Sequence, residues 1–435
     1  MSREKTLSDA VSLKDEDRAR LAEGDTTSIL KLLSDIFPAW GAVDEQAIRV
    51  DALAGGYSGA AVFKVTADSS GILPLLLRVP GNHGEDPAIE LFFKTSDPWI
   101  PAAAQRAWGA HPRHASLLYQ DNMDAPNICI TEFIVGSVGD ATLMNGPKAR
   151  HYASALGNAV GELHGLDSQW FDQGLTEKLG RDEQAVAVDS VENETTKQRI
   201  VELGSYQRFG RSFIDILVTE HLTEGDVEGV AQLGEAIFGL LDPNSLMGRL
   251  VVGHGDLKYD NTMIRSASTS ANPDLVLIDY DRVMRLPAAA DLGCYLHDPE
   301  PRSKKYPSLA NRRALAKGYR DACIESGMDM REFRETEIDD IVLAMEAGLL
   351  IRSLWLSTIM TTLFPQYRWV VPVLREGLAR AAKLLLQAKT DIGLREKILL
   401  NGSSRSVGKG FAVPLLFKTA LKALKRRGGL STPSG

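Results

Sequence analysis

The spacing of hydrophobic residues changes about one third of the way along the chain, and this change predicts two structural parts. Upstream, short apolar runs alternate with turns rich in glycine and polar residues, which is typical of β-strands. These runs cover residues 48–50, 61–65, 73–79 and 128–135. Downstream of residue 148 the apolar residues recur at helical spacing, first in the stripe Ala155, Leu156, Ala159, Val160 and Leu163. We expect an α+β fold with a small β-rich N-lobe over residues 47–135 and a larger helical C-lobe over residues 136–400.

The two ends of the chain differ from these lobes. Residues 1–46 predict a helical leader, with a short charged helix around Asp15–Leu21 and an amphipathic helix over Ser28–Ile36. Residues 401–435 combine a Ser/Gly-rich linker with a basic amphipathic helix that runs from Phe411 to Arg427. Such a helix either docks on the acidic body of the protein or makes peripheral contact with an anionic membrane surface.

Size and charge narrow the class of protein. With 435 residues the chain exceeds the usual size of a single core, in agreement with two lobes. It has 49 Lys and Arg against 57 Asp and Glu, which gives a formal net charge of −8. A general nucleic-acid binder carries a basic face, so this balance argues against one.

Three features predict a cytoplasmic protein. The three cysteines are odd in number and widely spaced, as expected in a reducing compartment. The N-terminal residues lack the apolar run of a secretion signal. The most apolar segment, Val342–Phe364, contains Glu346 and Arg352, and these two charges favour a buried core helix over a membrane span.

The passage His254–Asn261 contains the residues that carry the chemistry. It reads His-Gly-Asp-Leu-Lys-Tyr-Asp-Asn, and Asp279 follows an apolar strand further on. Phosphoryl transfer needs a carboxylate that orients and deprotonates the attacking hydroxyl, and oxygen ligands for Mg²⁺ beside the nucleotide phosphates. We therefore predict Asp256 as the catalytic base, and Asn261 and Asp279 as the ligands of Mg²⁺.

Other polar residues near this passage are predicted to support it. His254 is expected to brace the catalytic loop by hydrogen bonding, and Asp291 to brace the loop rather than to react. His164, at the end of a helical pattern, is expected to be a capping or packing histidine. Asp281 either assists the metal or only faces solvent.

Glycines between two N-lobe strands are candidates for binding phosphate. A backbone without Cβ atoms can turn tightly and present its N–H groups to an anion, although glycines are also common in ordinary hairpin turns. The candidate residues of this loop are Gly55, Gly56, Ser58 and Gly59.

A cation is expected on the strand that follows the glycine loop. Arg78 either pairs with phosphate oxygens through its guanidinium or is only an exposed residue at a strand end. Its carboxylate partner is predicted to be Glu90, with Glu85 as the alternative. Glu132, at the junction of the lobes, completes the predicted nucleotide site.

These residues resemble the superfamily of aminoglycoside phosphotransferases and choline/ethanolamine kinases. The resemblance runs from about Ile48 to Ala381 and is most specific over Val252–Asn261 and Val276–Asp291. It implies a bilobal protein-kinase-like fold. It also implies that the protein transfers the γ-phosphoryl group of ATP, with Mg²⁺ as cofactor, to a hydroxyl of a small molecule.

Several passages are similar to the choline/ethanolamine branch in particular. They are Leu53–Ser58, Leu76–Gly81, Asp291–Asp298, Tyr306–Ser308 and Arg352–Trp355. The similarity implies an amino alcohol as substrate and an acceptor pocket that includes Asp281, Asp298, Tyr306 and Trp355. Because Arg352 would repel a quaternary ammonium group, a less bulky amino alcohol or a polyol is equally open. The alternative acceptor is an aminoglycoside, another antibiotic or a sugar.

Two other classes of protein are weighed against this prediction. One is a catalytically silent kinase-like binding module, but the intact Asp256, Asn261 and Asp279 argue against it. The other is a protein kinase, but no Asp-Phe-Gly or Ala-Pro-Glu sequence follows Asp279. An activation segment for a peptide substrate is therefore missing.

Overall fold

The chain divides into two compact units in the computed structural model. The first unit comprises Met1–Gly136 and Val276–Asp281, and the second comprises Ser137–Leu275 and Arg282–Gly435. The short segment Val276–Asp281 thus belongs to the first unit although it lies far along the chain. The structure describes residues 13–53, 60–68, 71–79, 99–109, 111–121, 128–173, 247–266, 273–280, 282–296, 307–328, 336–349, 387–388 and 390–394.

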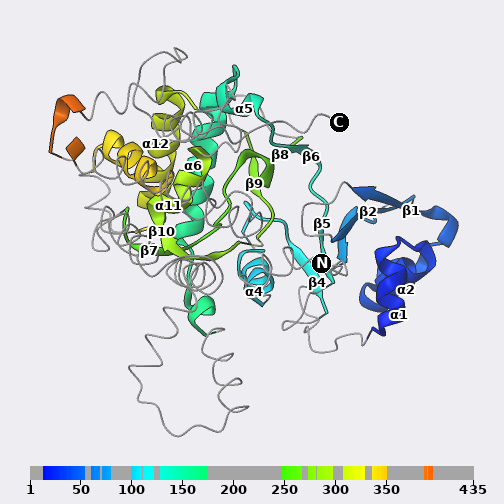
Figure 1. Cartoon of the computed structure of the whole chain (residues 1–435). Coiled ribbons are helices and arrows are strands. Elements are labelled where there is room, and N and C mark those ends of the chain that lie inside the picture. The colour runs from blue at the N-terminus through cyan, green and yellow to red at the C-terminus, as the bar shows by residue number, and fades with distance from the viewer. Residues whose placement is uncertain are drawn as a thin grey trace, which may run out of the picture. The chain divides into compact units, whose positions relative to one another are not determined.

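The first unit is built on a five-stranded antiparallel sheet. Its strands are β1 (Ile48–Leu53), β2 (Ala61–Ala67), β3 (Leu75–Val79), β4 (Leu117–Gln120) and β5 (Cys129–Glu132). Their spatial order is β1-β2-β3-β5-β4, which makes β3 the central strand (Figure 1). Residues of β3 alternate between buried and half-buried, so Leu77 and Val79 face the core while Arg78 points to the opposite face. Each predicted strand of the N-lobe is present, although the run 128–135 forms a strand only over Cys129–Glu132 and β4 was not predicted.

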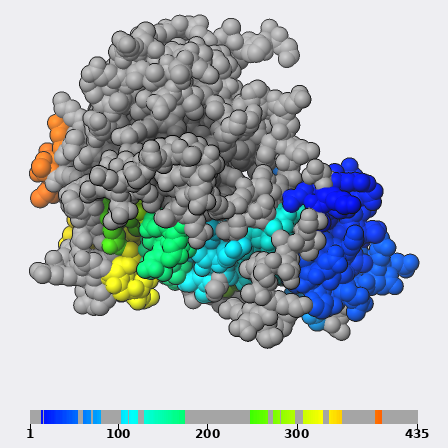
Figure 2. All heavy atoms as spheres, turned by 90° about the horizontal axis from the view of Figure 1, so that it is seen from below, coloured from blue at the N-terminus to red at the C-terminus, as the bar shows by residue number. Residues whose placement is uncertain are grey.

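Two N-terminal helices complete the core of this unit. The amide of Ser28 donates to the Asp25 carboxylate (2.9 Å), which caps the second helix. Leu21 and Ile29 from the helices join Val65 from β2 in one buried hydrophobic cluster, and Figure 2 shows the blue atoms of this region packed into one mass. The two helices of the predicted leader therefore belong to the core of the first unit. The helices of this unit are α1 (Asp15–Ala22), α2 (Thr26–Ile36), η1 (Pro38–Ala42), η2 (Glu45–Ala47) and α4 (Trp99–Trp108).

The second unit contains most of the described helices. Two long ones, α6 (Ala149–Gly165) and α12 (Leu309–Glu325), pack tightly against each other (Figure 1). Glycines permit this close approach: a Cβ atom on Gly157 would lie 2.1 Å from the carbonyl oxygen of Leu315. The other elements of this unit are α5 (Thr142–Asn145), β7 (Leu250–Gly253), η3 (Tyr259–Asn261), β8 (Thr262–Arg265), β10 (Met284–Pro287), α11 (Ala288–Gly293) and η4 (Cys294–Leu296). Two further strands, β6 (Gly136–Val138) and β9 (Leu275–Leu277), each contain residues of both units.

Small sheets in this part of the chain carry the residues around the predicted catalytic loop. β7 pairs antiparallel with β10, and Gly253 lies opposite Met284. A three-stranded sheet has the order β6-β8-β9, and it includes β8, which the strand predictions did not contain. The loop between β7 and β8 holds His254–Asn261, so two short strands fix both of its ends.

The most apolar predicted segment begins as a buried helix. Residues 342–349 of Val342–Phe364 are described, and they belong to a helix over 338–349 with mostly buried side chains. Glu346 forms an ion pair there with Arg312 of α12. In the ranges that the structure describes, no helix has the length and apolar character needed to span a membrane.

Candidate active site

The strand β7 and the helix α11 bring together two parts of the predicted catalytic machinery. β7 ends at Gly253, directly before His254. Its antiparallel partner β10 leads into α11, and that helix carries Asp291. The carbonyl oxygen of Arg249 accepts from the amide of Ala288 (3.1 Å), which fixes the start of α11 beside β7. A pairing of strands thus places Asp291 next to a loop that lies 36 residues earlier in the chain.

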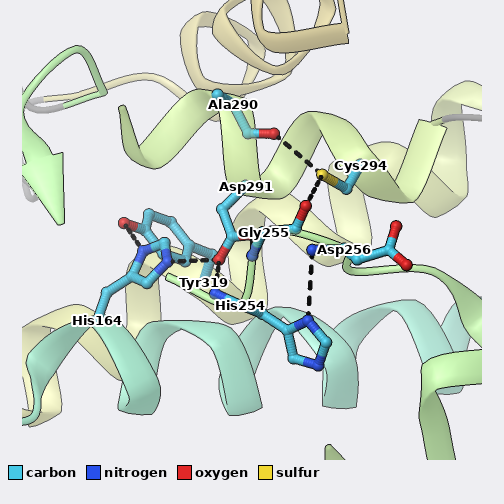
Figure 3. A network of polar contacts seen from close by, with 8 residues as sticks. All are labelled: His164, His254, Gly255, Asp256, Ala290, Asp291, Cys294 and Tyr319. Atoms are coloured by element: carbon cyan, nitrogen blue, oxygen red, sulfur yellow. Dashed lines mark hydrogen bonds and ion pairs between the residues drawn. The ribbon is translucent and has the colours of Figure 1, made fainter. Parts of the chain in front are cut away.

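The carboxylate of Asp291 holds the backbone of this loop. Its Oδ2 accepts from the amide of His254 (2.8 Å) and from Nε2 of His164 (3.0 Å). Its Oδ1 accepts from the amide of Gly255 (2.8 Å), as Figure 3 shows. The Asp291 side chain is fully buried. Hydrogen bonds to a buried ionised carboxylate are among the strongest in proteins, so the position of the loop backbone is set by this one side chain.

Neighbouring charges and burial shift the pKa of Asp291 in opposite directions. Burial by itself raises the pKa of the carboxyl. This effect is outweighed by the hydrogen bond and electrostatic attraction from His164, by the attraction from His254 and by the hydrogen bond from the Gly255 amide. The pKa of Asp291 is consequently held below its usual value of 3.8. The group is therefore a carboxylate at neutral pH and acts as a hydrogen-bond acceptor.

His164 connects this carboxylate to the two long helices. It stands at the end of α6, and its Nδ1 lies 3.0 Å from the hydroxyl of Tyr319 on α12. Because a carboxylate can only accept, the hydrogen bond to Asp291 is donated by Nε2. The sequence predicts a capping or packing histidine at this position and does not connect it with the predicted catalytic loop. No spacing in the sequence links residue 164 with residue 291.

Two glycines are required by this arrangement. Gly255 has a φ of +74°, and a Cβ atom there would lie 1.9 Å from the carbonyl oxygen of Arg282. A Cβ atom on Gly253 would lie 2.4 Å from Oδ2 of Asp291. Any side chain at either position would push the loop away from the residues that hold it.

Asp256 presents its carboxylate on the outer side of the loop. The side chain points away from the Asp291 network (Figure 3), and it is 18% exposed. The amide nitrogen Nδ2 of Asn261 donates to Oδ2 of Asp256 (3.0 Å) and to its carbonyl oxygen (2.8 Å). The backbone amide of Asp256 donates to Nδ1 of His254 (3.4 Å). The structure therefore brings together three of the predicted residues, His254, Asp256 and Asn261, in one hydrogen-bonded loop.

Lys258 is a further charged residue of the loop that sequence reasoning missed. Its Nζ lies 3.3 Å from Oδ2 of Asp256 and 3.7 Å from Oδ2 of Asp260. The amide of Lys258 donates to the carbonyl oxygen of Asp256 (2.9 Å), and the turn η3 follows. This turn directs the side chain back toward Asp256. A positive charge two residues after the predicted base was the signal that could have identified Lys258.

The donor atoms of Asn261 and Asp279 are of the kind that Mg²⁺ prefers. Both N–H groups of the Asn261 amide point to Asp256, which leaves its Oδ1 as an oxygen donor. Asp279 belongs to the first unit and is exposed, with a φ of +67°. Of the described non-glycine residues only Asp279 has a positive φ, and such strain is concentrated at functional sites. The described residues contain no cluster of three or more His, Cys, Asp or Glu that could hold a metal.

The predicted nucleotide-binding residues of the first unit are only partly described. Arg78 lies on the central strand β3, opposite Cys129 of β5, and is half-buried. Glu132 is the last residue of β5 and pairs with Leu75. The remaining predicted residues lie outside the described ranges, as does the basic segment Phe411–Arg427. These residues are Gly55, Gly56, Ser58, Gly59, Glu85, Glu90, Asp281, Asp298, Tyr306, Arg352 and Trp355.

The sequence model of the APH phosphotransferase enzyme family matches residues 49–322 of the chain. This range is more than half of the protein, and it contains both the catalytic loop and Asp279. The protein belongs to the phosphotransferase enzyme family. The resemblance inferred from the sequence is therefore confirmed. No curated protein sequence matches the chain.

Solved structures agree with this membership at the level of fold. A choline kinase from Cryptosporidium parvum Iowa II is similar with a TM-score of 0.53 and 18% sequence identity, over 85% of this chain and 98% of that chain. An ethanolamine kinase from Plasmodium vivax is similar with a TM-score of 0.50 and 11% identity, over 82% of this chain and 92% of that chain. At these identities the likeness shows the fold alone. This phosphotransferase has a bilobal α+β protein-kinase-like fold, as predicted.

Proposed function

We propose that this phosphotransferase moves the γ-phosphoryl group of ATP, with Mg²⁺, to a hydroxyl of a small molecule. An amino alcohol of the choline/ethanolamine type is the acceptor that we favour. The observation that carries the proposal is the Asp256 carboxylate, which is partly exposed on a loop whose backbone is fixed by the buried Asp291. A rigidly presented carboxylate is what a kinase needs to orient an alcohol.

Asp256 has the role of orienting the acceptor and receiving its proton. The acceptor hydroxyl donates to one carboxylate oxygen while Asn261 donates to Oδ2 and holds the group in place. As the new bond forms between the acceptor oxygen and the γ-phosphorus, the bond from that phosphorus to the β,γ-bridging oxygen breaks. The hydroxyl proton passes to Asp256, and ADP leaves with the bonding electron pair.

Lys258 stabilises this arrangement electrostatically. Its ammonium group lies beside Oδ2 of Asp256 and favours the ionised carboxylate that must accept the proton. The same charge attracts phosphoryl oxygens that approach the acceptor. Lys258 is 32% exposed, so its hydrogen-bonding capacity can be shared with a ligand that binds at the loop.

The proposed ligands of Mg²⁺ are Oδ1 of Asn261 and the carboxylate of Asp279. When bound, the ion neutralises charge on the β- and γ-phosphates and keeps the nucleotide in a reactive conformation. Asn261 both positions Asp256 and binds the cation in this proposal: its amide nitrogen donates to Asp256, and its Oδ1 is the proposed ligand of the cation. Arg78 and the loop Gly55–Gly59 are the proposed binders of the nucleotide phosphates.

The test is an ADP-release assay with ATP and Mg²⁺ against a panel of alcohols. The panel holds choline, ethanolamine, amino-acid alcohols, aminoglycosides, macrolides and sugars. Asp256→Ala should lower turnover on the active acceptor by about a thousandfold or more while the affinity for ATP changes little. Asp321→Asn, on the exposed side of α12, is the matched control and should retain full turnover.

The outcomes separate the alternatives. If the protein phosphorylates an amino alcohol and Asp256→Ala abolishes this turnover, the favoured acceptor is supported. If turnover occurs only with an aminoglycoside or a sugar, the acceptor belongs to that class instead. Full turnover in Asp256→Ala would overturn the assignment of the base. If the protein binds no ATP under any condition, the catalytically silent binding module becomes the better explanation.

A further inference from the structure

The residue after Asp279 is buried in the first unit. Tyr280 is 5% exposed, whereas Asp279 is exposed to solvent. The hydroxyl of Tyr280 donates to the carbonyl oxygen of Leu277 (2.7 Å), three residues earlier. This hydrogen bond closes a loop that contains Ile278 and Asp279.

A histidine completes the hydrogen bonding of this tyrosine. Nδ1 of His114 forms a short hydrogen bond with the hydroxyl of Tyr280, and both side chains are buried. The single hydroxyl proton is already directed to Leu277, so Nδ1 of His114 must be the donor. The contact therefore fixes which nitrogen of His114 carries a proton.

The backbone near His114 also holds the strand that precedes Asp279. The amide of Leu277 donates to the carbonyl oxygen of Arg113 (2.8 Å), and Leu277 forms a parallel bridge with His114. Trp108 stacks on His114 with ring centroids 5.6 Å apart, and it meets Tyr280 edge-on at the same separation. Backbone and side-chain contacts thus anchor the residues on both sides of Asp279 to one segment of the first unit.

These contacts explain how Asp279 can keep a left-handed backbone. A φ of +67° is unfavourable for a residue with a Cβ atom, and it persists only where the neighbouring residues impose it. Leu277 before it and Tyr280 after it are both fixed, which leaves Asp279 at the apex of a closed turn. The backbone on both sides of Asp279 is therefore held by the contacts that Leu277 and Tyr280 make with Arg113 and His114.

We infer that His114 and Tyr280 are positioning residues that hold Asp279 in its left-handed conformation and so set the affinity of the protein for a divalent cation. This inference rests on the proposed function, in which Asp279 is a ligand of Mg²⁺. His114 acts through Tyr280, and Tyr280 acts through the turn that it closes. Neither side chain is proposed to touch the cation or the substrate.

The test compares His114→Gln, Tyr280→Phe and the core variant Val65→Ala. Val65 is fully buried in a hydrophobic cluster that includes neither His114 nor Tyr280, so it controls for a general loss of stability. Binding of Mn²⁺ in the presence of ADP is measured by electron paramagnetic resonance, and turnover is measured as a function of Mg²⁺ concentration. The two clamp variants, His114→Gln and Tyr280→Phe, should bind Mn²⁺ about tenfold more weakly, which corresponds to about 1.4 kcal/mol. Their turnover should recover when Mg²⁺ is raised.

The clamp variants should lose Mn²⁺ affinity while they keep the fold. Val65→Ala should leave the Mn²⁺ affinity unchanged even if its melting temperature falls as far as that of the clamp variants. Unchanged Mn²⁺ binding in both clamp variants would overturn the inference while leaving the proposed function intact. If the wild-type protein with ADP binds no divalent cation, the proposed role of Asp279 fails and the inference fails with it.

Discussion

Replacing Asp291 with asparagine removes the charge that holds the catalytic loop and keeps the shape of the side chain. The carboxylate accepts three hydrogen bonds, two on Oδ2 and one on Oδ1. An amide has a single acceptor oxygen. In its better orientation the new amide would keep the contacts with His254 and His164, and its NH₂ group would face the N–H of Gly255.

The cost follows from this geometry. One hydrogen bond to an ionised group is lost, and a buried amide is left without its acceptor, which together amount to about 2–3 kcal/mol. The other orientation loses two hydrogen bonds and costs more. Because Asp291 is fully buried, solvent does not screen the loss. Total stabilities are of the order of 5–15 kcal/mol, so the effect is well within the range of measurement.

The effect should depend on pH in a defined direction. The pKa of Asp291 is lower in the folded protein than in the unfolded chain, so its stabilising contribution is complete above about pH 5 and is lost as the pH falls through the folded-state pKa. The asparagine variant has no titrating group at this position. The difference in stability between the wild-type protein and Asp291→Asn should therefore be largest near neutral pH and should narrow below about pH 4.

Urea unfolding at several pH values, followed by circular dichroism, measures these differences. Asp321→Asn serves as the control because Asp321 is 37% exposed, and removal of its charge should cost less than about 0.5 kcal/mol. Turnover of Asp291→Asn should also fall, since the loop that presents Asp256 loses its anchor. A stability loss at pH 7 no larger than that of the control would refute the role given to the carboxylate.

Substitutions at two further positions, Gly255 and Lys258, probe the same loop. Gly255→Ala and Gly327→Ala introduce a Cβ atom at φ values of +74° and +75°, but only the first would meet a neighbouring atom. In urea unfolding, the free energy of unfolding should fall by about 1 kcal/mol for Gly327→Ala and by more than about 3 kcal/mol for Gly255→Ala. Equal decreases in the two variants would contradict the observed packing. Lys258→Ala should lower kcat by about a hundredfold with little change in the KM for the acceptor, because it removes a charge beside the base. Lys258→Arg should recover part of this loss in the same assay, and an unchanged kcat in Lys258→Ala would exclude the electrostatic role.

The order of residues along the chain was enough to predict the chemistry and the class of fold. Asp256, Asn261 and Asp279 were predicted because phosphoryl transfer needs those residue types in that order, and an apolar strand was expected before Asp279. Local patterns of this kind are read from neighbouring residues, so they need no knowledge of long-range contacts.

The contacts that hold the site together became visible only in the folded chain. His164, on α6, contacts Asp291, which stands 127 residues later in the chain, and His114 contacts Tyr280 across 166 residues. No periodicity links such residues, because their proximity depends on how strands pair and helices pack. Lys258 is a different case: it lies within the motif, but its contact with Asp256 depends on the turn that follows. The sequence thus specifies which groups can react, whereas burial and long-range hydrogen bonding decide how rigidly those groups are presented.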